Sequence, residues 1–291
     1  MSARATAGTP RVRRTNPVRL LKATLANFID HDMAMRASAL AFQILFSLFP
    51  FVIFLLTLIG TFGLPDFILD LRQQAASLLP QPAVDLVNQV LEELQLPRGG
   101  LLSVSAVVAL WSASAGMRAT MNAFNVAYGV RESRATWKVY VLSVLYTVAL
   151  AALFVVCAGL LFIAPRAMQW LADRAGVDRI FVLAWASLRY PLAILLLCIS
   201  ASVVYYSAPA RQPHFQLVTP GAIVAVLAWI AASKAFDFYV ANFANYSATY
   251  GSIGSIVVLL TYLYLTSAVL LMGAEINAAL QRLHDDEPAR L

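Results

Sequence analysis

"IGSIVVLLTYLYLTSAVLLMGA", residues 253–274, is a run long enough to cross a membrane as a single helix. It contains no charged side chain, and its polar groups are hydroxyls. A helix needs about 20 mostly apolar residues to span the hydrocarbon core of a bilayer. A helix also satisfies its own backbone hydrogen bonds, which hydrocarbon cannot do. The run therefore predicts a membrane-spanning α-helix.

Similar apolar runs precede this one along the chain. They cover residues 37–62, 101–127, 137–163, 188–207 and 219–242. Of the 291 residues, 60% are hydrophobic and only 12% are charged, whereas a soluble domain carries about 25% charged residues. So few ionic groups cannot make a surface that water solvates. We therefore predict an all-α fold, a polytopic membrane helical bundle with six transmembrane helices.

The segments outside the apolar runs differ in charge and pattern. Lysine and arginine concentrate in residues 1–36, and such residues favour the cytoplasmic side of a membrane. We therefore expect cytoplasmic tails at 1–36 and 281–291, so that both termini face inward from a transmembrane domain at 37–280. The outer loop at 63–100 has apolar residues at helical spacing, which predicts two short amphipathic extracytoplasmic helices.

The sequence contains no pattern typical of an enzyme. His31, His214 and His284 lie far apart, and no nucleotide-binding or hydrolase motif is present. We therefore expect a non-enzyme with no catalytic residue, no metal site and no cofactor. Cys157 and Cys198 lie inside apolar runs and are expected to be packing residues. The basic tail lacks interleaved aromatic residues, so we expect membrane lipids as partners and no nucleic acid.

Lys234 and Asp237 stand near the end of the fifth apolar run. An ionisable side chain costs roughly 2.5–3.5 kcal/mol at the centre of a bilayer, so it needs a partner or water. The two residues are three apart and share one helical face. They form either an ion pair that locks the helix in place or the lining of a polar cavity. The sequence does not decide between these alternatives.

The polar segment that follows is the second part of the same candidate site. Residues 243–252 carry no charge and form the predicted outer turn between the fifth and sixth helices. Asn242, Asn245 and Tyr250 supply hydrogen-bonding groups there. Irregular backbone at membrane depth is tolerated where it is buried in protein or lines a cavity. We therefore count these three residues as candidate substrate-binding residues together with Lys234 and Asp237.

Four further polar residues lie in or at the end of apolar helices. Arg118 and Asn122 are four apart on the second helix, and Asn125 extends their face. Arg118 either extends its guanidinium toward the cytoplasmic interface or makes a structural bond to another helix. The alternative for this face is contact with an anion or lipid headgroup. Glu275 follows the sixth run and is either an interfacial acid paired with arginine or lysine, or a proton-coupling group in a cavity.

Four segments carry a resemblance to a known family. They are "ALAFQILFSLFPFVIFLLTLIG" (39–60), "LWSASAGMRATMNAFNVAYGV" (110–130), "YYSAPAR" (205–211) and "VANFANYSATYGSIGSIVVLLTYLYLTSAVLLMGAEINAAL" (240–280). In these segments the chain resembles the YihY/BrkB family of bacterial inner-membrane proteins, some of which carry the old and mistaken label ribonuclease BN. The resemblance covers about residues 30–283. It implies six membrane helices and the bacterial cytoplasmic membrane.

The resemblance also implies a class of function. Members of the family have been associated with serum resistance and with export of a lipid A precursor, which implies a translocator of a lipid or amphiphile. The recurring family positions are Pro50, Asn122, Tyr128, Pro209, Pro220, Tyr250, Gly251, Gly273 and Glu275.

Three hypotheses follow, in order of preference. The first is a transporter or flippase-like translocator in envelope biogenesis, with a cavity that reaches the candidate residues. The second is a non-transporting membrane scaffold for envelope assembly, and the third is a membrane hydrolase. The sequence leaves open whether the chain forms a homo-oligomer.

Overall fold

The computed structural model describes residues 17–61, 99–158, 179–211, 213, 216–243 and 252–285. Within these ranges the chain is helical and contains no strand. The helices are α1 (Pro17–Asp30), α2 (Met33–Thr61), α5 (Gly99–Ala127), α6 (Thr136–Ala158), α8 (Arg179–Ser207), α9 (Pro220–Phe243) and α11 (Ser252–Asp285). The predicted outer helices at 63–100 lie outside the described residues.

The described part of each of the six apolar runs falls in one helix, which confirms the predicted all-α membrane fold. Four described segments are long and apolar enough to cross a membrane: Thr136–Leu153, Ser187–Ser207, Pro220–Val240 and Ile256–Leu283. Met33–Leu48 is a shorter apolar segment of α2. The described part of α5 is not among the four, because its serines and Arg118 lower its hydropathy.

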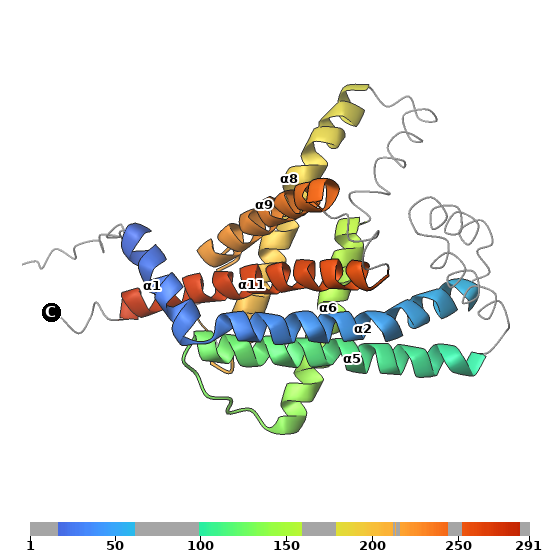
Figure 1. Cartoon of the computed structure of the whole chain (residues 1–291), viewed down its shortest axis with the longest axis horizontal. Coiled ribbons are helices and arrows are strands. Elements are labelled where there is room, and N and C mark those ends of the chain that lie inside the picture. Colours follow the sequence, from blue (N-terminus) through green and yellow to red (C-terminus); the bar gives the residue numbers. More distant parts are fainter. Residues whose placement is uncertain are drawn as a thin grey trace, which may run out of the picture.

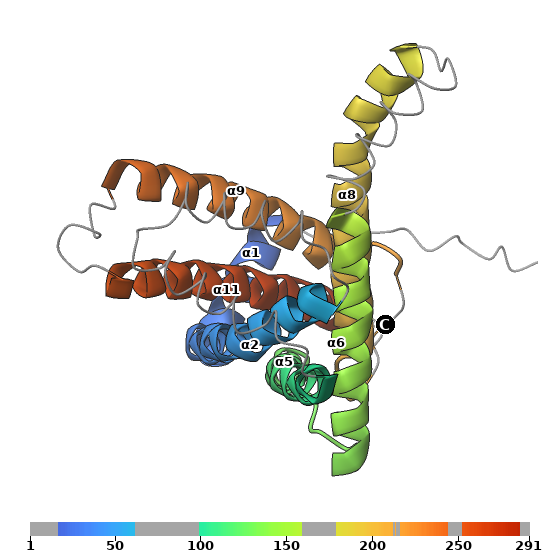
Figure 2. The same cartoon turned by 90° about the vertical axis from the view of Figure 1, so that its right-hand side faces the viewer.

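The helices form two groups that cross each other. In Figure 1, α2, α5 and α11 lie side by side with their long axes aligned. In Figure 2, α6 and α8 run next to each other and cross the direction of α9 and α11 steeply. α9 packs on α11, and α6 packs on α5. The two groups therefore meet along the side of α5 and α9.

Two differences from the sequence prediction concern helix ends. α1 lies inside the segment predicted as a cytoplasmic tail, and it packs on α11 and α2. α11 continues to Asp285, past the predicted end at residue 274. A polar continuation of a membrane helix carries no apolar signal, so hydropathy alone does not locate its end.

The buried core gathers at one end of the helices. Its largest members include Phe124, Met121, Tyr205 and Leu271, which are almost fully buried. Small residues such as Ala37, Ala127, Ala222 and Ala274 fill the spaces between them, and small side chains let helices approach closely. Outside this core many of the exposed large side chains are apolar, for example Val148, Leu195, Leu227 and Val257. Such a surface suits acyl chains.

Gly221 and Gly273 allow a close crossing of α9 and α11. A Cβ atom on Gly273 would collide with the Tyr205 hydroxyl and would lie 2.8 Å from the Ala225 Cβ. A Cβ atom on Gly221 would collide with the Gly273 carbonyl oxygen. Both glycines are therefore needed for α9 and α11 to meet backbone to backbone.

Candidate functional site

Most of the cross-helix polar contacts of the described residues lie at one end of the molecule. We call it the polar end. It comprises the starts of α2 and α9, the last turns of α5, α8 and α11, and the turn at 128–135. It forms because successive membrane helices run in opposite directions, so that alternate helix ends meet.

A histidine and a glutamate join α1 to α11 at the polar end. His31 Nδ1 lies 2.6 Å from Glu275 Oε1, although the two residues are 244 positions apart. Glu275 is fully buried, and its Oε2 has no hydrogen-bond partner among the described residues. The partner is thus a histidine rather than the arginine or lysine that the sequence analysis considered.

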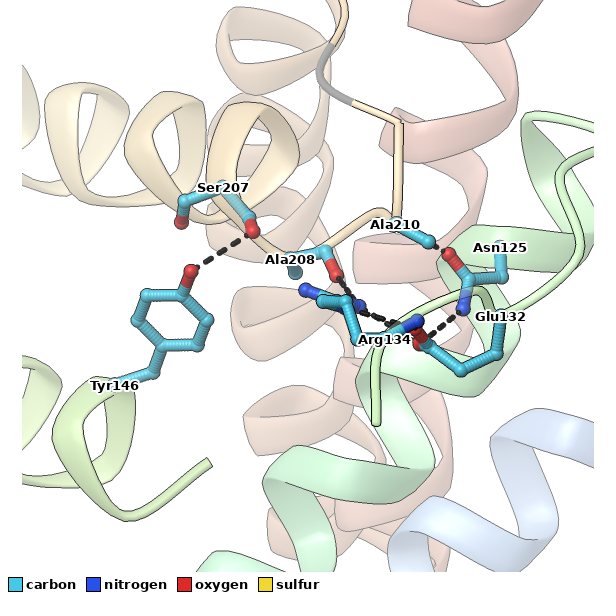
Figure 3. Close-up of polar contacts among 7 residues, drawn as sticks. All are labelled: Asn125, Glu132, Arg134, Tyr146, Ser207, Ala208 and Ala210. Carbon is cyan, nitrogen blue, oxygen red and sulfur yellow. Dashed lines mark hydrogen bonds and ion pairs between the residues drawn. The ribbon is translucent and has the colours of Figure 1, made fainter. Parts of the chain in front are cut away.

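A second network connects the turn after α5 to the end of α8 (Figure 3). Arg134 donates to both carboxylate oxygens of Glu132 at 2.8 Å and to the carbonyl oxygen of Ala208 at 2.9 Å. Asn125 donates to Glu132 at 2.9 Å and accepts the Ala210 N–H at 2.7 Å. Hydrogen bonds from Arg134 are the main cause that lowers the pKa of Glu132 to about 2. The network fixes this turn against α8.

Asn277 joins the start of α9 to α11. Its Oδ1 accepts the Gly221 N–H at 2.8 Å, and its Nδ2 donates to Thr219 Oγ1 at 3.0 Å. Thr219 also accepts from the Ala222 N–H at 3.2 Å, which is the contact of a helix N-cap. The Thr219 N–H donates to Ser202 Oγ of α8 at 2.9 Å. One cap therefore connects three helices.

A cavity of about 450 Å³ opens beside this cap. Its hydrogen-bonding side chains include Tyr128, Tyr206, Gln216, Asn277 and Gln281. Burial is the main cause that raises the pKa of the Tyr128 hydroxyl, so this group stays protonated. Most of the lining is apolar, and the hydroxyl and amide groups within it suit the polar part of a ligand.

A second cavity, of about 280 Å³, lies deeper between the two helix groups. Its lining is almost entirely apolar and comes from α5, α6, α8, α9 and α11, including Met117, Leu150, Leu197, Val226 and Trp229. Tyr205 lines the first cavity, while its neighbour Val204 lines the second. The Tyr205 hydroxyl donates to the Leu270 carbonyl oxygen at 2.8 Å. Tyr205 and Leu270 thus lie where the two cavities approach each other.

The cysteines behave as predicted. Cys157 and Cys198 are both free and buried, and Cys157 lines the deeper cavity. Burial of this kind is typical of cysteines that serve in packing.

Arg118 and Asn122 point to different neighbours. Arg118 donates to Ser114 at 2.9 Å and to Ser143 of α6 at 3.4 Å, and its guanidinium lies 4.4 Å from the ring centroid of Tyr140. Asn122 accepts from Arg36 of α2 at 3.0 Å. Both residues therefore make contacts between helices, in line with the structural alternative.

The other candidate residues lie away from the polar end. Lys234 and Asp237 are exposed on α9, and within the described chain they form no ion pair with each other. Neither lines one of the cavities described above. Asn242 belongs to the last turn of α9, but its side chain lies outside the described part, as do Asn245 and Tyr250. Their assignment to a binding site stays a prediction.

Sequence reasoning missed several residues of the polar end as site residues. His31, Glu132 and Arg134 lie in a tail and a loop, where charged residues are common. Tyr205 and Asn277 lie in apolar helices, and Asn277 follows Glu275 by two positions. The position of Asn277 so close to Glu275, near the end of an apolar run, was the signal that could have indicated Asn277 as a site residue.

Comparison with known proteins gives the family. The family of the virulence factor BrkB matches residues 24–290. YfkH of Bacillus subtilis strain 168, a protein named as ribonuclease-like, is 38% identical over 273 residues, which cover 92% of this chain and 98% of that protein. UPF0761 membrane proteins of Xanthomonas campestris and Xanthomonas axonopodis are 25% identical over 269 residues, or 87% of this chain. The alignments cover 58% and 59% of those longer proteins.

No solved structure matches the chain significantly. The family match and the long apolar helices agree with each other, since relatives are named as membrane proteins. The chain is therefore a multi-pass membrane protein that belongs to the BrkB family.

Proposed function

We propose that this protein translocates a lipid or another amphiphile across the membrane, without making or breaking covalent bonds. The observation that carries the proposal is a pair of cavities on either side of the hydrogen-bonded residues Tyr205 and Leu270, of which the first has polar groups in its lining and the second almost none. The cavity of about 450 Å³ offers tyrosines and amides, and the cavity of about 280 Å³ is apolar. An amphiphile has a headgroup that needs hydrogen-bonding partners and a chain that needs only apolar walls.

The position of the cavities supports this match. The polar cavity lies at the polar end, where a headgroup enters from the interface. The apolar cavity lies deeper, at the level of membrane-spanning residues of α6, α8, α9 and α11. A headgroup bound at Asn277 and Gln281 would direct its acyl chain past Tyr205 toward Leu150 and Leu197. Binding sites that combine apolar walls with a few polar groups are typical of small-molecule ligands.

Charge supports an orientation for this site. Basic residues of the polar end and its flanks include Arg19, Lys22, Arg36, Arg131, Arg134 and Arg211. Lysine and arginine favour the cytoplasmic side of short loops. We place the polar end on the cytoplasmic side of a bacterial inner membrane, with both termini inside. The ligand would then load from the inner leaflet.

A cavity-filling substitution tests the proposal. Ala201 of α8 lines the apolar cavity, so Ala201→Phe would occupy part of it. Val203→Phe is the matched control, because Val203 lies two positions later with an exposed side chain. Purified protein is reconstituted in liposomes, and movement of a fluorescent phospholipid between leaflets is followed by quenching from outside.

We expect the wild type and Val203→Phe to move the probe faster than protein-free liposomes, and Ala201→Phe to move it at least several-fold more slowly. Size-exclusion profiles check that each variant is folded. Equal rates for wild type and protein-free liposomes, across probes with several headgroups, would overturn the proposal.

A membrane scaffold is the second candidate, and one observation favours it. Lys234 and Asp237 are exposed within the span Pro220–Val240. In lipid such exposure is costly, so a polar partner from another protein or a second copy would relieve it. Alanine at each position, followed by the exchanged pair Lys234→Asp with Asp237→Lys, tests this candidate. Loss of a co-purifying partner at normal protein level would support it, and unchanged association in all variants would exclude it.

A further inference from the structure

We propose that the polar end carries an anion subsite, formed by Arg211 and Arg282, that binds the phosphate group of the amphiphile. This inference rests on the proposed function for the identity of the ligand as an amphiphile. The subsite itself rests on a third cavity, separate from the two already described.

The third cavity has a volume of about 170 Å³ and adjoins the larger polar cavity. Both cavities are lined by Tyr128 and Gln281, which lie where they meet. Arg211, from the segment between α8 and α9, and Arg282, from the last turns of α11, line only the smaller one. A headgroup in the larger cavity can therefore place a charged group in the smaller one.

The charge around the third cavity is positive. Among the residues that the structure describes, its lining contains two arginines and no acidic residue. Two acids of the polar end have partners of their own: Glu132 is paired with Arg134, and Glu275 with His31. Neither glutamate is among the described residues that line the cavity. Arg282 interacts electrostatically with the buried Glu275, so the positive charge that the described residues leave without a partner is mainly that of Arg211.

The two arginines differ in a useful way. Arg282 donates from Nη2 to the carbonyl oxygen of Ala127, which fixes its guanidinium while other N–H groups remain available. Arg211 is exposed, and the described part of the chain records no hydrogen bond or ion pair for it. One arginine is therefore preorganised and the other can close on a ligand. Guanidinium groups bind phosphate through paired, charge-assisted hydrogen bonds.

Binding measurements on the full chain in a neutral detergent test the subsite. The probes are a short-chain phosphatidylglycerol, a diacylglycerol of the same chain length that lacks phosphate, and inorganic phosphate. The variants are Arg211→Gln, the charge-preserving Arg211→Lys, and the control Arg131→Gln. Arg131 is exposed in the neighbouring turn and lines none of the three cavities, so its loss changes net charge equally.

We expect the wild type to bind phosphatidylglycerol at least tenfold more tightly than diacylglycerol. Arg211→Gln should weaken phosphatidylglycerol binding about tenfold at low salt, because the variant loses a charge-assisted hydrogen bond to the phosphate. Arg211→Lys should retain part of the affinity, and Arg131→Gln should match the wild type. Binding of inorganic phosphate alone, lost in Arg211→Gln, would support the anion subsite but assign it to free phosphate.

The subsite is overturned if Arg211→Gln and Arg131→Gln bind phosphatidylglycerol alike, or if diacylglycerol binds as tightly as phosphatidylglycerol. In the second case the proposed function stands, because an amphiphile still binds. If neither lipid binds and no phospholipid moves in the liposome assay, the proposed function fails as well. The two failures are therefore distinguishable.

Discussion

His31 Nδ1 and Glu275 Oε1 lie 2.6 Å apart and join the turn after α1 to the interior of α11. The glutamate is fully buried, whereas 23% of the histidine side chain is exposed. The pair therefore anchors a helix from the N-terminal segment to the centre of the polar end. It gives α1 a structural role that a charged tail would not have.

Removal of the histidine should destabilise the protein. In His31→Ala the Glu275 carboxyl loses its partner while it stays buried, which costs about 3 kcal/mol when one member of a buried pair is removed. Glu275→Gln should cost less, because a neutral amide can still accept from the imidazole. Thermal unfolding in detergent measures both variants. A larger loss in Glu275→Gln than in His31→Ala would contradict this reading of the pair.

Stability should fall in acid through Glu132. The pKa of Glu132 is lowered from 4.5 to about 2, chiefly by hydrogen bonds from Arg134. A group with a lowered pKa in the folded state stabilises above its unfolded pKa, and this contribution is lost as pH falls from about 4.5 to 2. We expect this contribution of Glu132 to the free energy of unfolding to be about 1 kcal/mol, because solvent screens its side chain, which is 31% exposed.

Glu132→Gln is the comparison for this acid effect. The free energy of unfolding of Glu132→Gln at pH 7 should be lower than that of the wild type. Between pH 4.5 and pH 2 this free energy should fall less in the variant than in the wild type. Unfolding curves at several pH values, recorded for both proteins, provide the measurement. Identical pH profiles for wild type and Glu132→Gln would exclude the assigned role.

The glycine crossing of α9 and α11 should not tolerate a methyl group. Gly273→Ala would push against the Tyr205 hydroxyl and the Ala225 Cβ, and overpacking of this kind typically costs about 1–3 kcal/mol. Gly116→Ala is the control within α5, because its Cβ would lie 3.6 Å from Gln43 Cγ, an ordinary contact. The midpoint temperature of thermal unfolding should therefore be lower than in the wild type for Gly273→Ala. It should be unchanged or higher for Gly116→Ala. Equal stability of the two would argue against a tight crossing.

The sequence predicts the membrane helices because a span needs a long apolar run, and each such run can be read locally. Hydropathy does not indicate α1, because "PVRLLKATLANFID" mixes basic, acidic and apolar residues. This helix packs on α11, and such a tertiary contact cannot be read from the local sequence. Helix α5 illustrates the intermediate case. Its run is recognisable, but Arg118 and several serines make it the least apolar of the six.

The polar end could be predicted only in part. Glu275 attracts attention as an acid beside an apolar run, but its partner His31 lies 244 positions away, and no local pattern connects them. Arg118 and Asn122 share a helical face in the sequence, yet one contacts α6 and the other α2. Which residues meet depends on how each helix is rotated about its axis. That rotation is set by packing with neighbours, which a single sequence does not contain.

Photocrosslinking with lipids tests most directly whether the two cavities hold one amphiphile. A phospholipid with a photoreactive group at the end of its acyl chain is bound to the purified protein, irradiated, and its attachment sites are mapped by mass spectrometry. We predict labels at residues that line the apolar cavity, such as Leu150, Leu197 and Val226. A headgroup-labelled lipid should mark Tyr128 or Gln281 instead. Labels from both lipids only on outward-facing residues such as Val148 and Leu195 would contradict the proposal.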